Sequence, residues 1–316
     1  MKFRFVISLI LLTLITPPAN AAIKVVASKP AIINVSPIGS GDQISDVAVN
    51  SAGVAIVGTV ENGMTNLIST TPLGGSDGFI SFVDNLKNRT WDLRLGTPSD
   101  DIATGIARDK SGNFWVVGST SKPLEPLISP SLDPTVLNLD NVLVDPVTNP
   151  SSELLRLVAW KVSASGQLLG TYFYDAAGVI APTQISVSTS GFKVIGSLLN
   201  EGETNQFQID LDSAGVFTNL AEGKPKVSKA PAIATIKAGT NNLKSFISKT
   251  TIIGIPSWRA KKPTPVLVKY TKNGKALAAN SFSGKVLKVM WQSGVGAVVL
   301  VDQKGEFELH ILTNMG

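Results

Sequence analysis

Residues 100–120 read DDIATGIARDKSGNFWVVGST, and this stretch decides the fold. An apolar alternating run from Ile102 to Ala107 leads into the turn Asp109-Lys110-Ser111-Gly112, and a β-branched and aromatic run follows and ends at Gly118. Aspartate at the first turn position can bind the backbone two residues on, and glycine tolerates the positive φ at the end. The stretch therefore predicts two short antiparallel strands joined by a tight turn.

The same pattern recurs along the chain. Three further runs end in a glycine, namely 55–57 at Gly58, 193–195 at Gly196 and 251–253 at Gly254, while a fifth run, 298–300, is followed by Val301. Third strands are expected over residues 78–84, 157–163, 206–212, 266–271 and 307–313. Fourth strands are expected over residues 90–95, 168–174, 216–220 and 275–282. Each complete unit therefore predicts a sheet of four short antiparallel strands.

Internal repeats of this kind stack radially. The predicted fold is thus all-β, a single β-propeller of five blades of four antiparallel strands, closed by an N-terminal strand. The fifth unit stops after its third strand, and an unpaired sheet edge is a liability that proteins cover. We therefore expect residues within 23–36 to pair with residues 307–313. A β-sandwich of the same strands is the structural alternative.

The first two units resemble the SBBP-type β-propeller repeat, a short family found in secreted bacterial proteins. In the second unit the resemblance covers Asp101, Ala103, Ile106, Ala107, Asp109, Gly112, Asn113, Val117, Gly118 and Thr120. In the first unit it covers Asp42, Val47, Ala48, Gly53, Val57, Gly58 and Thr59. Its motif is structural, so the resemblance implies a propeller and export and implies no particular chemistry.

The N-terminus predicts export. A basic start, an apolar run over residues 5–15 and the sequence Ala19-Asn20-Ala21 make up the layout of a secretory signal peptide. We expect cleavage before Ala22, which leaves residues 22–316 as one propeller domain without a transmembrane anchor; a retained N-terminal anchor is the alternative. The chain has no cysteine, and so no disulfide and no lipidated cysteine. The expected location is secreted or at the exterior of the cell envelope, or the periplasm if an outer membrane is present.

Signals for catalysis are weak. One histidine without any cysteine excludes a His/Cys zinc cluster, and we predict no metal and no cofactor. This residue, His310, aligns with packing positions of the other units. Glycoside hydrolysis by a carboxylate pair across the propeller channel is the enzymatic alternative, with the candidates Asp42, Asp46, Asp100 and Asp101. Asp42 and Asp101 occupy equivalent repeat positions, which favours a shared turn role.

Residues 122–152 are an insertion in the second unit. Six prolines disfavour regular structure there, while many Leu, Ile and Val residues indicate that much of it packs on something. A cover over one propeller face and a partner-binding loop are both open interpretations.

The charges are unevenly distributed. Residues 223–301 hold 14 Lys or Arg and no Asp or Glu, whereas the remainder holds 14 basic residues and all 23 acidic ones. Such a region attracts an anionic partner. Outside the cell we expect an anionic envelope polymer, lipid headgroups or another surface protein rather than nucleic acid. The candidate binding residues are Lys224, Lys226, Lys229, Trp258, Arg259, Lys261 and Lys262.

Together these patterns predict an exported, non-catalytic propeller that binds or scaffolds at the cell envelope. A lysine-rich face that is merely solvated, and a carbohydrate-active enzyme, are the two alternatives.

Overall fold

The computed structural model describes residues 23–34, 42–61, 67–86, 88–121, 153–223, 233–304 and 306–316. In these ranges the chain is all-β and forms five sheets. The described residues include no helix with the length and apolarity that crossing a membrane requires. The predicted signal peptide (1–21), the insertion (122–152) and the candidates Lys224, Lys226 and Lys229 lie outside the described residues.

Sheets 1, 2 and 3 are four-stranded antiparallel meanders whose strands pair in chain order. Sheet 1 contains β3 (Gln43–Asn50), β4 (Gly53–Val60), β5 (Asp77–Asp84) and β6 (Arg89–Leu95). Sheet 2 contains β7 (Asp101–Arg108), β8 (Phe114–Thr120), β9 (Arg156–Val162) and β10 (Leu168–Asp175). Sheet 3 contains β11 (Val179–Val187), β12 (Gly191–Asn200), β13 (Glu203–Asp212) and β14 (Phe217–Gly223). These strands match the predicted four-strand units.

Sheets 4 and 5 also take up strands from the N-terminal part of the chain. Sheet 4 contains β15 (Ile233–Ala238), β16 (Asn241–Ser248), β17 (Thr264–Tyr270) and β18 (Ala276–Ser281), with β1 (Val25–Ala27) added in parallel to β18. Sheet 5 contains β19 (Lys285–Gln292), β20 (Gly296–Gln303) and β21 (Glu306–Leu312). Its fourth strand is β2 (Ile32–Asn34), which pairs antiparallel with Phe307–Leu309. The predicted pairing of N-terminal residues with the last strand is confirmed, and the parallel β1 was not predicted.

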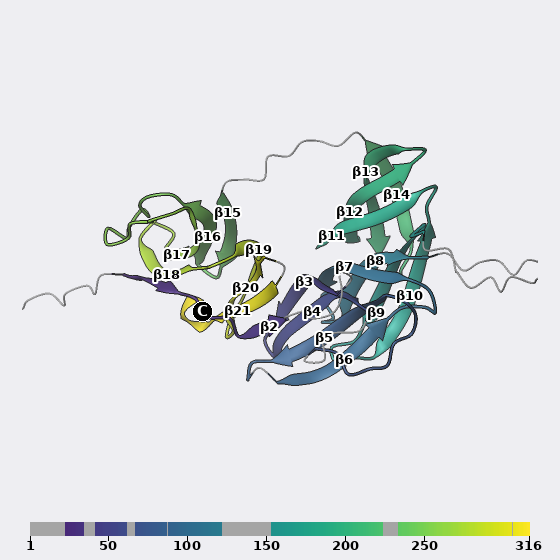
Figure 1. Cartoon of the computed structure of the whole chain (residues 1–316), viewed down its shortest axis with the longest axis horizontal. Helices are drawn as coiled ribbons and strands as arrows, with labels where there is room; N and C mark the ends of the chain where they lie inside the picture. The colour runs from purple at the N-terminus through teal and green to yellow at the C-terminus, as the bar shows by residue number, and fades with distance from the viewer. Residues whose placement is uncertain are drawn as a thin grey trace, which may run out of the picture.

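The sheets pack face to face in the order 4, 5, 1, 2, 3 (Figure 1). One apolar cluster joins each neighbouring pair in this order. Among the described residues no such cluster joins sheet 3 to sheet 4, so the arc of sheets is open between them. Ile195 and Leu199 on β12 are accordingly 37% and 44% exposed.

The glycines that end the predicted runs have a steric cause. The first strand of sheets 1, 2 and 3 carries a β-bulge, which begins at Ile44, Ala103 and Pro182. The residues opposite these positions are Gly58, Gly118 and Gly196. A Cβ there would lie 1.9, 1.8 and 2.2 Å from the carbonyl oxygens of Gln43, Ile102 and Ala181. Only glycine allows the bulged strand to approach this closely.

The prediction for the second strand of the fourth unit is wrong. That strand is β16, and the run 251–253 belongs to the loop that follows it. Gly254 has a φ of 82° and Ile252 forms a single bridge with Ile255, so the chain turns back on itself there. Ile252 and Ile255 are buried because they pack on the face of sheet 4, beside Val266 and Val268.

Candidate functional site

The loop between β16 and β17 contains the four described members of the predicted binding cluster. Trp258 packs on sheet 4, and its indole N–H donates to Ser248 Oγ at 3.0 Å. Arg259 is exposed and donates to the carbonyls of Pro256 and Trp258, both at 2.8 Å. Trp258 therefore anchors the loop and Arg259 stiffens it. Lys261 and Lys262 are exposed.

Lys262 lines a groove of about 920 Å³ between one end of sheet 4 and the adjoining end of sheet 5. Lys285, the first residue of β19, and Lys304, in the turn between β20 and β21, line the same groove. All three side chains are exposed. Lys304 has a φ of 60°, a left-handed conformation that belongs to the tight hairpin turn. Three lysines from three separate segments of the chain thus line one groove.

The walls of this groove are a mixture of apolar and neutral polar groups. The apolar part comes from Phe246, Ile247, Pro263, Pro265 and Val286. Ile247 is 59% exposed, which leaves its side chain available to a ligand. Hydroxyl and amide groups come from Ser245, Ser283 and Gln303, and Ser283 donates to Gln303. Apolar walls with a few polar groups are typical of ligand sites.

The groove lies in a strongly basic part of the protein. Residues 233–316 contain 12 Lys or Arg and three acids, Asp302, Glu306 and Glu308. The groove itself is lined by three lysines and Asp302, a net formal charge of +2.

Some lysines of this region already have structural partners. Lys288 binds the carboxylate of Asp46, and Lys269 donates to the carbonyl of Gly316. In the described part of the chain, no ion pair or hydrogen bond joins the side-chain ammonium group of Lys262, Lys285 or Lys304 to another residue. The groove lysines can therefore exchange water for an anionic ligand without breaking an ion pair.

The candidate acid Asp46 joins three sheets. Its Oδ2 accepts from the backbone N–H of Ile106 on β7 at 3.0 Å. Its Oδ1 accepts from the N–H of Val47 at 2.7 Å and from Lys288 Nζ on β19. With both oxygens bound and the side chain buried, Asp46 holds sheets 5, 1 and 2 together.

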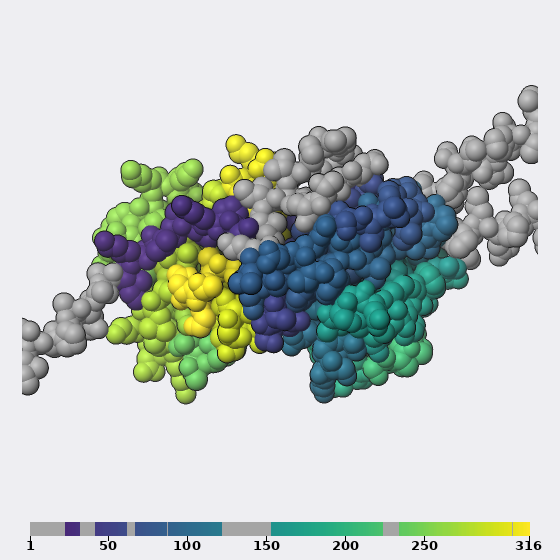
Figure 2. Space-filling model, turned by 90° about the horizontal axis from the view of Figure 1, so that it is seen from below, coloured from purple at the N-terminus to yellow at the C-terminus, as the bar shows by residue number. Residues whose placement is uncertain are grey.

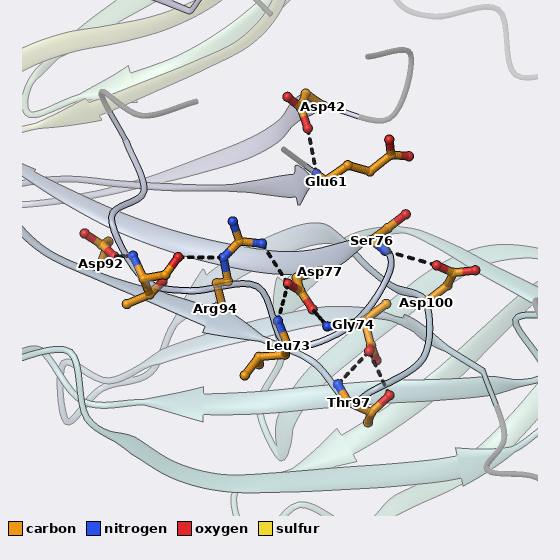
Figure 3. A network of polar contacts seen from close by, with 12 residues as sticks. Asp42, Glu61, Leu73, Gly74, Ser76, Asp77, Asp92, Arg94, Thr97 and Asp100 are labelled. Atoms are coloured by element: carbon orange, nitrogen blue, oxygen red, sulfur yellow. Dashed lines mark hydrogen bonds and ion pairs between the residues drawn. The ribbon is translucent and has the colours of Figure 1, made fainter. Parts of the chain in front are cut away.

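The other three candidate acids also bind backbone groups. Asp42 accepts from the N–H of Glu61 at 2.6 Å and Asp100 from the N–H of Ser76 at 3.0 Å (Figure 3). Asp101 accepts from the N–H of Thr97 at 2.6 Å. Burial raises the pKa of Asp101, and the charge of Asp77 adds to this. None of the four acids lines the groove or either of two smaller cavities described for the chain, so no carboxylate pair spans a pocket there.

A buried ion pair next to these acids had no signal in the sequence. Asp77 Oδ2 lies 2.7 Å from Arg94 Nη1, and the Asp77 side chain is fully buried (Figure 3). Asp77 also accepts from the backbone N–H groups of Leu73 and Gly74. Arg94 donates to the carbonyl of Thr70 at 3.0 Å. The pair fixes the loop before β5 against β6.

His310 is buried, as its alignment with packing positions predicts, and both ring nitrogens have partners. Nδ1 lies 2.8 Å from Ser28 Oγ, and Nε2 lies 2.9 Å from Glu308 Oε2. Burial lowers the pKa of His310, although the Glu308 carboxylate opposes this shift. Sequence reasoning missed Ser28 because it lies 282 positions from His310 and in no repeat unit.

Comparison with known proteins gives no family, and the similarities to solved structures are weak. No protein-family model matches the chain, and no curated protein matches it. A protein of unknown function from Dyadobacter fermentans is 10% identical, with a TM-score of 0.40 over 90% of this chain and 83% of that one. A putative 6-phosphogluconolactonase from Bacteroides fragilis is 10% identical, with a TM-score of 0.31 over 82% and 79%. The β-propeller domain of Nup133 from Vanderwaltozyma polyspora is 7% identical, with a TM-score of 0.24 over 82% and 71%.

Proposed function

We propose that this protein is an exported β-propeller module that binds an acidic polymer of the cell envelope in the groove between sheets 4 and 5. One observation carries the proposal. Lys262, Lys285 and Lys304 converge on a single groove, in a region with 12 basic and three acidic residues. Exposed lysines that line one groove, and whose ammonium groups bind no other residue, are best explained by an anionic ligand.

The five sheets are the five blades in this proposal. The repeated meanders, their face-to-face packing and the β2–β21 pairing support it. The resemblance of the first two units to the SBBP repeat points the same way. In this proposal the gap between sheets 3 and 4 is the place where the ring of blades would close.

The chemistry of the groove favours a polymer chain over a membrane surface, because a concave site admits a chain and a flat bilayer cannot enter it. Lysine offers a compact charge without the bidentate geometry of arginine, which suits single carboxylate or phosphodiester groups. The exposed apolar wall at Ile247 matches the apolar faces of sugar rings. Exposed ion pairs contribute only about 0.2–1 kcal/mol each, so affinity depends on several contacts and on salt.

The triple variant K262Q/K285Q/K304Q tests this proposal. Three lost contacts of about 0.2–1 kcal/mol each predict an affinity for teichoic acid or polyuronate that is roughly 3- to 150-fold lower at low salt. The measurement is a titration of fluorescently labelled polymer at several salt concentrations. The matched control K249Q/K272Q/K275Q removes three exposed lysines from the loops that connect strands of sheet 4, and none of the three lines the groove.

Equal affinities for the two triple variants would contradict the groove as the site. If the protein binds anionic vesicles tightly and binds neither polymer, the ligand is a lipid surface and the proposed polymer ligand is wrong.

Export is the second part of the proposal. The described fold begins at Ile23, whose carbonyl accepts from Ser257 Oγ at 3.4 Å. Cleavage before Ala22 would therefore leave every described residue in place. N-terminal sequencing of exported protein is expected to start at Ala22, and a chain that starts at Met1 would contradict the signal peptide.

A further inference from the structure

A second constellation lies at the same pair of sheets. Ser28 is in the connection from β1 to β2, and Glu308 and His310 project from β21 two positions apart. Ser28 Oγ is 2.8 Å from His310 Nδ1, and His310 Nε2 is 2.9 Å from Glu308 Oε2. A hydroxyl, an imidazole and a carboxylate thus form one hydrogen-bonded chain, and such triads are recognised by geometry and roles rather than by sequence order.

We propose that Ser28 is a nucleophile that accepts an acyl group from an ester, with His310 as its general base and Glu308 as the residue that positions the imidazole. This activity goes beyond the binding function and does not depend on it.

An ionised Glu308 favours one tautomer of His310. An ionised carboxylate only accepts hydrogen bonds, so the Nε2–H group of His310 donates to Glu308 Oε2. The lone pair of neutral His310 then lies on Nδ1, where it faces the hydroxyl of Ser28. A neutral imidazole within hydrogen-bond distance of a hydroxyl is the arrangement that general-base activation requires.

The three groups differ in exposure in the way that a nucleophile and its base require. His310 is 1% exposed and Glu308 is buried, while Ser28 is only half-buried. The ring of Phe282 contacts the imidazole edge-on, with centroids 5.3 Å apart. Burial lowers the pKa of His310 below its usual 6.5, which favours the neutral form of the base. Base and carboxylate are thus buried behind the hydroxyl of a residue that is itself only half-buried.

The backbone holds Ser28 in place from both sides. Its N–H donates to the carbonyl of Ser281 on β18 at 2.9 Å. Three residues later the N–H of Ala31 donates to the carbonyl of Leu309 on β21 at 2.7 Å. The N-terminal strands, purple in Figure 2, run over the surface of the green and yellow sheets. Ser28 is therefore a fixed group at the surface rather than part of a loose tail, as a preorganised nucleophile must be.

The reaction balances without a further reactant except water. The Ser28 hydroxyl proton passes to His310 Nδ1 as Oγ bonds to the carbonyl carbon of the ester. The bond from that carbon to the leaving oxygen breaks, and the leaving oxygen takes the proton from His310. Water, deprotonated by His310, then attacks the acyl-serine and releases the acid, and Ser28 Oγ recovers its proton.

An active-site-directed fluorophosphonate tests this inference on the mature chain. Ser28 Oγ is expected to attack phosphorus with loss of fluoride, and intact mass and peptide mapping should show one adduct, on Ser28. Ser28→Ala should abolish the adduct, whereas Ser281→Ala, a neighbouring serine, should retain it. His310→Gln should slow labelling at least about 100-fold, the usual size of general-base assistance.

The pH profile separates a positioned base from a merely structural contact. Labelling of the wild type should rise with pH and reach half its maximum below pH 6.5, because the neutral imidazole is the active form. Glu308→Gln should move that midpoint to lower pH, since Glu308 raises the pKa of His310. This readout holds even if His310→Gln does not fold. Absence of an adduct on the folded wild type, or an adduct that survives Ser28→Ala, would overturn the inference.

Discussion

Replacing Asp77 with asparagine is expected to lower the free energy of unfolding by about 3–5 kcal/mol, because it removes one partner of a buried ion pair. Arg94 is only 8% exposed, and its guanidinium would keep its charge without a carboxylate to balance it. The backbone N–H groups of Leu73 and Gly74 would also lose a charged acceptor. Urea unfolding at neutral pH measures the change.

The same substitution at Asp101 is the matched control. A Cβ on Gly96 would lie 3.0 Å from an oxygen of each carboxylate, so the two acids share one site. Because burial raises the pKa of Asp101, its contribution to stability falls as the pH rises above the unfolded-state pKa of about 3.9. Asp101→Asn removes that buried charge and should be neutral or stabilising at pH 7. If both variants lose the same free energy of unfolding, the unpaired charge of Arg94 is not the cause of the loss at Asp77.

Deleting residues 22–34 is expected to cost on the order of 5 kcal/mol and to cause aggregation. The deletion removes the pairing of β1 and β2 along β18 and β21, and each lost backbone hydrogen bond contributes about 0.5–1.5 kcal/mol. It also exposes two sheet edges, which favours association between chains. Thermal unfolding and light scattering measure the two effects.

The chain that starts at Ala22 is the control for this deletion, because it keeps every described residue. A synthetic peptide of residues 22–34 should restore part of the stability of the deleted chain. Unchanged stability and unchanged scattering after the deletion would contradict the role of the N-terminal strands.

The strands were predictable where short-range patterns determine them. Turn tetrads such as Asp109-Lys110-Ser111-Gly112 and the alternation of apolar residues placed the strands of sheets 1 to 3 correctly. The missing outer strand of sheet 5 followed from the cost of an open edge. The run 251–253 misled because Ile252 is buried on a sheet face, which selects the same apolar residues as burial inside a sheet, while Ile253 is 84% exposed.

The candidate sites were less predictable because they depend on contacts between distant residues. The basic run over 223–301 identified Lys262 and contained Lys285, but Lys304 lies beyond it. Only the packing of sheet 4 against sheet 5 brings the three lysines to one groove. Ser28 contacts His310 because β1 and β2 pack along sheets 4 and 5. These two strands belong to no repeat unit, so the repeat pattern could not predict the contact.

The most direct test of the proposed binding function is amine acetylation with and without polymer, read by peptide mass spectrometry at low salt. Bound teichoic acid or polyuronate is expected to protect Lys262, Lys285 and Lys304 and to leave Lys272 and Lys275, two exposed lysines outside the groove, fully reactive. Protection should disappear as salt rises, because exposed charges are screened within about 8 Å at physiological ionic strength. Equal reactivity of all five lysines in the presence of saturating polymer would contradict the groove as the binding site.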